Sequence, residues 1–506
     1  MTESKQKQVI LISLDALGCT DFEDAIQLPH FRRLVEQGAY CSHELSVYPS
    51  LTFPSHASIA TGCRPARHGI VSNYLLEPYS PVKLWNFYAT NMNCRALWDY
   101  AADGGKTVLS MSWPVSAGAN IRYSMPEMTP AKPKVWNAAS FFDQLGVLRR
   151  YGTPGFAVRT LLSSPRLPKA WFFGAQPTLD QEMIAAFLRT IHKTPDFDIA
   201  LLHIYGMDDA KHVHGANSIQ ARAYLSLYNE FIGKLFDYIE GNPQRDITLM
   251  ITGDHAQKDV RQTLYGNHLL EKLGLCRFQD GKLADYKAYF ECGDGMAYIR
   301  VEPPHNTPET VAAIEEAFRQ SPGVARVISP AEAARLGCDS TAALVIEAAD
   351  GYGFIGAACP GGMDNNCIGP SPDKGLHGYL PDGPDFQTMF FCYGQSVRPQ
   401  EIDSMCITDI TPTICQWLEL PADPMDGAPL PGLFKKEGRY CWSCNFWAPP
   451  PPRATPPFSA SATPARLPPP QAARRCAPAA RPWSTAIFCW TWAPTCTCTS
   501  CCMGLI

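Results

Sequence analysis

The chain has 506 residues, which is enough for one large domain with insertions or for two or three smaller domains. Hydrophobic residues make up 46% and charged residues 18%, so a sizeable core can be buried, and the formal net charge of -5 excludes the strongly basic surface of proteins that bind nucleic acid polymers. No stretch reaches the roughly 18 consecutive apolar residues of a membrane-spanning helix, and the apolar run at 9–14 is too short for a secretory signal. We therefore expect a soluble, cytoplasmic protein with no membrane partner, whose oligomeric state stays open.

Strand-like and helix-like segments alternate along residues 1–435. Strands are predicted at 9–14, 107–111, 198–204, 247–252 and 388–393. Helices are predicted from apolar residues at three- and four-residue spacing at 29–36, 94–102, 180–192, 219–239 and 410–418. This alternation predicts an α/β fold with a mostly parallel central sheet and helices on both of its faces. In such sheets, ligands bind in the loops beyond the carboxyl ends of the strands.

The pattern changes between about 268 and 375, where shorter strand-like pieces appear. A strand is predicted at 297–301, and helices are predicted at 308–320 and 330–336. We interpret 268–375 as an inserted cap or side subdomain next to the functional site. Residues 1–267 and 376–435 would then form one catalytic domain.

The cysteines divide the chain into two parts. Twelve of the 20 cysteines precede residue 436 and are spread singly, which is typical of reduced thiols in a cytosolic protein. The other eight fall in the last 66 residues, which contain 13 prolines and no Asp, Glu or Lys. A disordered linker, a metal-binding appendage using Cys441 and Cys444, or translation out of frame would each explain the tail at 436–506. The composition of the tail favours translation out of frame, and resequencing the 3′ end of the gene tests this hypothesis.

Acidic and histidine residues follow several of the predicted strands. Asp15 directly follows the strand at 9–14, and Asp254 and His255 follow the strand at 247–252. His377 lies in a Gly-Leu-His-Gly segment, where glycine permits unusual backbone geometry. Alone, a strand-end aspartate is more often a cap for the next turn, and a single histidine is more often structural. Together, these residues predict a metal site at the edge of the sheet.

Thr52 lies where a helix is expected to begin, with Pro54 suited to the first helical turn. A hydroxyl at this position faces the positive end of the helix dipole, which favours an alkoxide. By itself, Thr52 is more simply explained as an N-cap. A nearby set of metal ligands favours the nucleophile instead, because a bound cation activates a weak hydroxyl nucleophile.

Asp208 and His212 are four residues apart in the segment that follows the strand at 198–204. If this segment is helical, both side chains lie on one face and can bind one ion. Asp209 and His214 are the competing candidates, but they project in other directions from such a helix. We therefore rank them second and expect His214 to act as a hydrogen-bonding neighbour.

Five motifs in chain order resemble the alkaline phosphatase superfamily, and within it the nucleotide pyrophosphatase/phosphodiesterase family. The first combines Thr-Phe-Pro-Ser-His and Thr-Gly at 52–62 with Arg-His-Gly-Ile-Val-Ser-Asn at 67–73, and the others are at 208–215, 254–255, 375–378 and 409–421. The resemblance covers essentially residues 8–434, and five matches in the right order are highly specific.

The resemblance implies a role for each matching residue. One Zn²⁺ would be bound by Asp208, His212 and His377, and a second by Asp15, Asp254, His255 and Thr52. Thr52 would be the nucleophile and become transiently phosphorylated, the amide of Asn73 would bind a non-bridging phosphoryl oxygen, and Phe53 would stack on a nucleobase. The Asp/His ligand set without cysteine favours Zn²⁺, although other divalent ions also bind such sites.

Three residues depart from the family pattern. Ser55 replaces an asparagine found in many members, Ala216 replaces a proline, and His203 replaces a tyrosine expected five residues before the metal-binding Asp208. Tyr205 lies nearby but would point elsewhere. The preference for nucleotides is therefore predicted less firmly than phosphoryl transfer to and from Thr52. The expected substrate is a small phosphodiester or nucleotide.

Four other functions compete with a phosphodiesterase. Cleavage of a phosphonate C–P bond and phosphomonoester hydrolysis use the same residues in the same superfamily. Cys63-Arg-Pro-Ala-Arg67 matches the motif from which sulfatases make a formylglycine, although it follows the expected helix instead of preceding it. A binding protein that holds metal without turnover is the fourth, and the complete set of seven predicted ligands argues against it.

Overall fold

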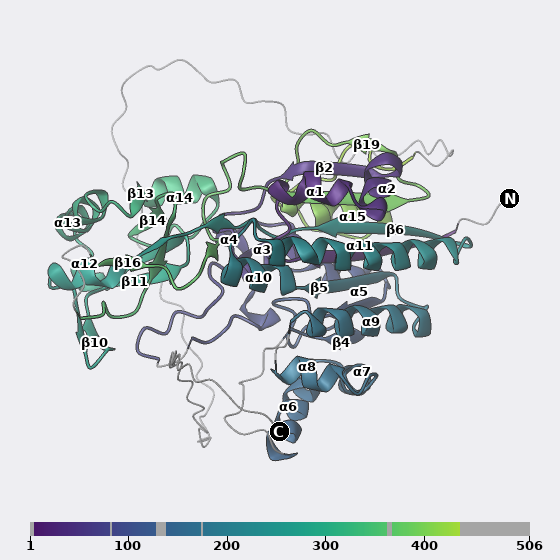
Figure 1. Ribbon diagram of the computed structural model, residues 1–506, viewed down its shortest axis with the longest axis horizontal. Coiled ribbons are helices and arrows are strands. Elements are labelled where there is room, and N and C mark those ends of the chain that lie inside the picture. Colours follow the sequence, from purple (N-terminus) through teal and green to yellow (C-terminus); the bar gives the residue numbers. More distant parts are fainter. Residues whose placement is uncertain (1–4, 81–82, 128–137, 174–175, 362–366, 436–506) are drawn as a thin grey trace, which may run out of the picture. The chain divides into compact units, whose positions relative to one another are not determined.

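An eight-stranded sheet forms the centre of the computed structural model, which describes residues 5–80, 83–127, 138–173, 176–361 and 367–435 (Figure 1). Its strands are β1 (Gln6–Leu14), β2 (Ala39–Glu44), β3 (Val108–Met111), β4 (Tyr123–Met125), β5 (Ile199–Ile204), β6 (Arg245–Thr252), β18 (Thr388–Gly394) and β19 (Gln400–Glu401). The strand order is β19-β2-β18-β6-β1-β5-β3-β4. The five strands from β6 to β4 are mutually parallel, whereas β18 is antiparallel to both of its neighbours. The predicted fold class, a mostly parallel sheet in an α/β fold, is confirmed.

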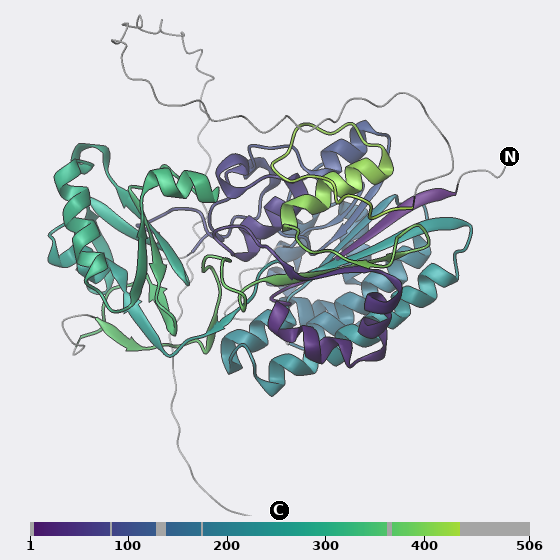
Figure 2. The same ribbon diagram turned by 90° about the horizontal axis from the view of Figure 1, so that it is seen from above.

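Helices cover both faces of this sheet, as Figure 2 shows. One face packs against α2 (Pro29–Gln37), α9 (Thr178–Lys193) and α11 (Ile219–Glu240), and the other packs against α3 (Thr52–Thr61), α5 (Leu97–Asp103) and α15 (Ile410–Leu418). Strand β1 is buried on both sides because residues 9–12 are all apolar: Ile10 and Ile12 belong to the first core and Val9 and Leu11 to the second.

A second, antiparallel sheet lies between β6 and β18 in the chain. It consists of β11 (Ala288–Gly293), β12 (Met296–Val301), β14 (Leu344–Ala348) and β13 (Val324–Ile328). In the chain, α13 (Pro308–Arg319) comes between β12 and β13, and α14 (Pro330–Leu336) comes between β13 and β14. The adjoining three-stranded sheet has the order β15 (Tyr352–Ile355), β8 (Gln262–Tyr265), β16 (Ile368–Pro370). Helix α12 (Gly266–Lys272) directly follows β8.

These elements share their own hydrophobic core, which includes Leu264, Phe290, Ile299 and Phe318. The core also includes Ala256, Val260 and, from β8, Leu264, all of which precede the predicted boundary at 268. The division into a catalytic domain and an inserted cap at 268–375 stays a prediction. The predicted tail at 436–506 lies outside the described residues.

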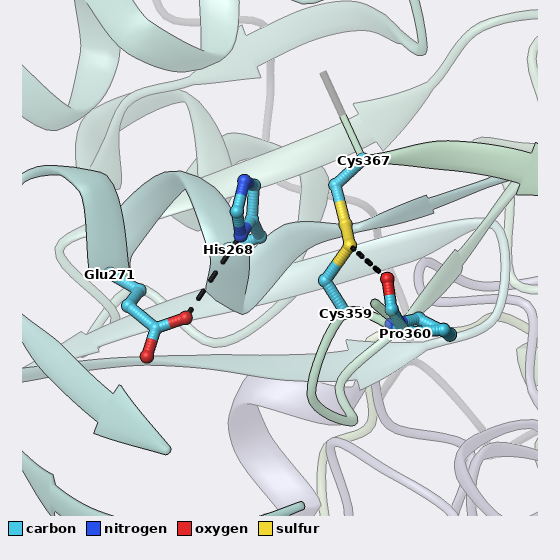
Figure 3. Close-up of a disulfide and its surroundings, with 5 residues drawn as sticks. All are labelled: His268, Glu271, Cys359, Pro360 and Cys367. Atoms are coloured by element: carbon cyan, nitrogen blue, oxygen red, sulfur yellow. Dashed lines mark hydrogen bonds and ion pairs between the residues drawn. A yellow bond between two sulfur atoms is a disulfide. The ribbon is translucent and has the colours of Figure 1, made fainter. Parts of the chain in front are cut away.

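One expectation about the cysteines is wrong. Cys359 and Cys367 form a disulfide with their Cα atoms 6.2 Å apart, whereas both had been expected as reduced thiols (Figure 3). Their pairing follows from tertiary structure, because β15 and β16 flank β8 and bring the loop residues next to them together. The other ten cysteines of the described part of the chain are free.

Within the described residues, no helix combines the length and apolar content that crossing a membrane requires.

Candidate active site

The carboxyl ends of three parallel strands meet at one edge of the central sheet. Leu14, the last residue of β1, pairs with Ile204, the last residue of β5, and Ser13 pairs with Thr252, the last residue of β6. The residues that follow each strand therefore lie at the same level, and they carry the predicted acids. This confirms the sheet edge as the place where these side chains gather.

The first cluster consists of Asp15, Asp254, His255 and Thr52. The Nε2 atom of His255 lies 3.3 Å from Asp15 Oδ1, 3.4 Å from Asp254 Oδ2 and 3.2 Å from Thr52 Oγ1. Asp15, Asp254 and His255 are fully buried or nearly so, and Thr52 is 9% exposed. Four donor atoms this close together have the spacing of ligands around a single metal ion.

Thr52 is the first residue of α3, and the N-cap is Leu51. Because Thr52 lies inside the helix and Leu51 occupies the N-cap position, the simpler explanation of Thr52 as an N-cap is wrong. Its Oγ1 atom instead lies at the amino-terminal end of a buried ten-residue helix, next to the acids of the first cluster.

The second cluster consists of Asp208, His212 and His377. The structure confirms that 208 and 212 share a helix face, since α10 (Gly206–His214) brings Asp208 Oδ2 within 3.4 Å of His212 Nε2. His377 Nε2 lies 4.0 Å from Asp208 Oδ1. The competing residues Asp209 and His214 are exposed, which agrees with their lower rank.

The two clusters adjoin each other. The imidazoles of His255 and His377 are stacked with their centroids 4.0 Å apart, and those of His212 and His377 are 5.1 Å apart. All seven predicted ligands therefore come together, although they are spread over most of the chain. Each cluster also satisfies the spacing expected for ligands of one ion.

Protein groups balance the charges of the first cluster only in part, through His203. Burial and the neighbouring Asp208 raise the pKa of Asp15 to about 7, and burial together with Asp15 raises that of Asp254 well above its ordinary value. Asp15 Oδ1 and Asp254 Oδ2 are buried without a hydrogen-bond partner. Two buried carboxylates with unpaired oxygens next to a neutral imidazole fit a divalent cation, which would stabilise their charged forms.

The second cluster has a different balance. Burial disfavours charge on both groups, but the mutual attraction of Asp208 and His212 lowers the pKa of the acid and raises that of the imidazole to about 10. Burial lowers the pKa of His377, so this imidazole is neutral and can act as a ligand. One carboxylate and two imidazoles are donors that Zn²⁺ accepts.

Asn73 is anchored to the backbone of Phe53, the residue that follows Thr52. Its Oδ1 atom accepts a hydrogen bond from the backbone N–H of Phe53 at 2.9 Å, and the side chain is 6% exposed. With its oxygen engaged in this way, the amino group of Asn73 is the end that can donate to a substrate.

Phe53 differs from its predicted role. The ring is 1% exposed, with Trp85 and Phe87 packed at centroid distances of 5.3 and 5.8 Å. It therefore has no free face for a nucleobase. Trp85 and Phe87, which pack on Phe53, are only partly buried, and so is Tyr74, which packs on Trp85. The motif gave the residue type at 53 but no information about which rings would cover it.

His203 lies behind the first cluster instead of facing a substrate. Its Nε2–H donates to Asp15 Oδ2 at 3.1 Å, and its Nδ1–H donates to Glu127 Oε2 at 2.8 Å. Burial disfavours its charge, but Glu127 and Asp15 raise the pKa of His203 well above its ordinary value. One oxygen of Asp15 is thus fixed while the other, Oδ1, faces the cluster. Sequence reasoning missed Glu127, which no motif contains.

We expect the substitution Glu127→Gln to weaken metal binding about 10- to 100-fold, because hydrogen-bond partners behind a metal ligand orient it. Competition with a chromogenic zinc chelator measures the dissociation constant. Glu182→Gln is the matched control, since Glu182 bonds to Ser164 on another face of the fold. Equal zinc affinity in the Glu127 variant and the wild type would show that His203 holds Asp15 without help.

The positions of Cys63 and Ala216 in the structure explain two other features of the sequence. Cys63 follows Gly62 at the carboxyl end of α3, about 15 Å of helix away from Thr52, so it cannot take the place of a sulfatase nucleophile. The backbone N–H of Ala216 donates to Asp259 Oδ1 at 2.7 Å, a bond that a proline there could not make.

The fold and the site together define an alkaline-phosphatase-like hydrolase fold with paired clusters of acids and histidines around a threonine. The family model for type I phosphodiesterase / nucleotide pyrophosphatase matches residues 9–380. The chain belongs to this family.

The sequence identity to individual relatives is low, or it extends over a short part of the chain. The chain is 26% identical over 265 residues to venom phosphodiesterase 2 of Crotalus adamanteus, a match that covers 51% of the chain but only 27% of that protein. It is 32% identical over 76 residues to the mouse bis(5'-adenosyl)-triphosphatase enpp4, which is 15% of the chain and 16% of the relative.

Solved structures share the fold over most of the chain. Human ectonucleotide pyrophosphatase / phosphodiesterase 5 aligns with a TM-score of 0.57 at 18% identity, covering 83% of this chain and 97% of the human one. The murine protein, solved as an inactive threonine-to-alanine variant in complex with AMP, aligns with a TM-score of 0.58 at 18% identity, with the same coverage of both chains.

Proposed function

We propose that the chain hydrolyses small phosphodiesters or nucleotides through a phosphothreonine formed on Thr52 at a site for two Zn²⁺ ions. The observation that carries this proposal is the hydroxyl of Thr52, which lies 3.2 Å from His255 Nε2 at the amino-terminal end of α3. Asp208, His212 and His377 provide a second set of ligands next to it.

Each of the two ligand sets would hold one ion. Asp15, Asp254 and His255 would hold one ion beside the Thr52 hydroxyl, and the second cluster would hold the other. When bound, such a pair of ions lowers the pKa of hydroxyl groups and neutralises charge on the phosphoryl group and the leaving oxygen. Asp15, Asp254, His255 and His377 are buried, which limits their contact with bulk water and strengthens these interactions, whereas Asp208 and His212 are partly exposed.

Thr52 carries the covalent chemistry. After loss of its proton to solvent, Oγ1 forms a bond to phosphorus while the bond to the leaving alkoxide breaks, and the alkoxide takes up a proton as an alcohol. Water then attacks phosphorus, the bond to Oγ1 breaks, and the products are a phosphomonoester and the free hydroxyl of Thr52. The dipole of α3 favours negative charge on Oγ1 throughout.

The relatives support the choice of a phosphodiester. The matching family is named for phosphodiesterase and nucleotide pyrophosphatase activity, and the murine protein of similar fold binds AMP. That the threonine-to-alanine variant of the murine protein is inactive agrees with a threonine nucleophile. Since the chain covers about a quarter of the venom phosphodiesterase, the substrate is proposed from the site and not transferred from that protein.

A substrate screen with zinc present tests this function. It compares a nitrophenyl nucleotide diester, the corresponding monoester, a lipid-like diester and phosphonoacetate. We expect the nucleotide diester to give the highest kcat/KM. Faster cleavage of phosphonoacetate would favour the C–P hydrolase, and binding of two metal ions without turnover of any substrate would favour a binding protein.

Removing the Asn73 amide should slow the chemical step. We expect Asn73→Ala to lower kcat by roughly 10- to 1,000-fold, because a donor to the transition-state oxygen is lost while the nucleophile remains. Stopped-time assays at saturating substrate measure kcat. Asn91→Ala is the control, since Asn91 bonds to Asn86 in the same loop region. A change in KM alone would contradict a role in the transition state.

A further inference from the structure

A second group of potential metal ligands lies in the three-stranded sheet, apart from Thr52. His268 is in the first turn of α12, directly beyond β8, Cys359 follows β15, and Cys367 immediately precedes β16. Strands β8 and β15 are parallel and end together at Tyr265 and Ile355, whereas β16 begins antiparallel to the end of β8. All three residues therefore emerge from the same edge of this sheet.

The geometry of the group suits a single small ion. One ligand atom from each residue lies within 4.8 Å of the other two, so the three atoms are close enough to bind one ion. Figure 3 shows the imidazole of His268 between the sulfur atoms and Glu271, whose Oε2 lies 4.0 Å from His268 Nδ1. Cys367 is completely buried, whereas Cys359 and His268 are partly exposed, so an ion could enter from the solvent side.

The charge around the group also suits a cation. Burial and the neighbouring Lys272 lower the pKa of His268, which keeps the imidazole in its neutral, metal-binding form at neutral pH. Glu271 adds a negative charge on the side away from the sulfur atoms. Two thiolates and one imidazole prefer Zn²⁺ or another thiophilic ion over Mg²⁺ or Ca²⁺.

We propose that Cys359, Cys367 and His268 form a redox-controlled Zn²⁺ site, which binds the ion when both cysteines are reduced and is closed when they form the disulfide. Water completes the fourth position. In a reducing compartment this part of the chain would be held together by the ion, and in an oxidising one by the S–S bond. The site uses none of the residues around Thr52 and does not depend on the proposed hydrolase function.

The disulfide is converted to the zinc-bound form in two steps, reduction and metal binding. A trialkylphosphine and one water molecule convert the disulfide to two thiols, and the phosphine becomes a phosphine oxide. Zn²⁺ binding then displaces the two thiol protons to solvent, so binding becomes tighter as the pH rises. Hydrogen peroxide would oxidise the two thiolates to the disulfide and release the ion, while the peroxide takes up two protons and becomes two water molecules.

Cobalt is the probe that separates this site from the Thr52 site. The full chain is reduced with a trialkylphosphine, freed of it, and titrated with Co²⁺. Thiolate ligands give a near-ultraviolet charge-transfer band that Asp and His ligands do not, so the band reports cysteine ligation. Because the cysteines after residue 436 can also bind cobalt, only the part of the band that is lost on substituting Cys359 is assigned to this site.

We expect a loss corresponding to one Co²⁺ per chain in both Cys359→Ser and Cys367→Ser, and a weaker affinity in His268→Ala. Cys276→Ser is the matched control and should keep the full band, because Cys276 lies in the same core and donates to the carbonyl of Asn267. His212→Ala should also keep it, which separates the result from any failure of the Thr52 site. An identical band in Cys359→Ser, or a disulfide that the phosphine cannot open in the folded chain, would overturn the proposal.

Discussion

Replacing Thr52 with alanine is expected to lower turnover of a nitrophenyl nucleotide diester by about 10³-fold or more, because the oxygen that bonds to phosphorus is lost. Asp15, Asp254 and His255 remain, so metal content should stay close to that of the wild type. Steady-state kinetics and metal analysis on one preparation measure both quantities.

Two variants control for effects on folding. Thr52→Ser keeps a hydroxyl at the same position and should retain measurable activity. Thr61→Ala removes a buried hydroxyl at the opposite end of α3, where it donates to Ala57, and should leave kcat near wild type. Hydrolysis that survives in Thr52→Ala would mean that water attacks phosphorus directly and would rule out the phosphothreonine.

Chelation of metal ions is expected to abolish activity and to lower the melting temperature. In the absence of a cation, Asp15 and Asp254 are buried acids with raised pKa values and unpaired oxygens, so their ionisation at neutral pH opposes folding. Zinc at about 100 times its dissociation constant should stabilise the fold by about 2.7 kcal/mol per site. Thermal unfolding with and without EDTA measures the shift, and added zinc should restore activity.

The variant Asp254→Asn isolates the first cluster in this experiment. It should bind less zinc and show a smaller rise in melting temperature on zinc addition. Its metal-free form should melt at or above the temperature of the metal-free wild type, because a neutral amide replaces an acid whose charge burial and Asp15 disfavour. Relative to the wild type, the variant is therefore expected to melt at a lower temperature with zinc bound and at an equal or higher temperature without metal. A metal-free variant that melts well below the wild type would show that Asp254 stabilises the fold without an ion.

Local sequence patterns predicted the elements that hold the site. The apolar run at 9–14, in which Ser13 is the one polar residue, lies in the buried part of β1, and the helix expected at 410–418 has the bounds of α15. The four-residue spacing of Asp208 and His212 correctly placed both on one helix face. These features depend on neighbours within one or two turns of the chain, which is the range over which periodicity carries information.

Local sequence patterns did not predict contacts between segments that are far apart along the chain. Glu127 reaches Asp15 only through His203, Trp85 covers Phe53, and the disulfide between Cys359 and Cys367 requires two strands to pair with β8. The antiparallel direction of β18 was likewise not predicted, since a buried strand has the same composition in either direction.

The amino-acid sequence by itself determined the class of fold, the family and the residues that make up both ligand clusters, because strand ends and short motifs fix residue type and local direction. Only the tertiary structure decided which side chains stand behind those ligands, which rings are covered and which cysteines meet. Those outcomes depend on burial and hydrogen bonding between segments that are far apart along the chain, and no local spacing encodes them.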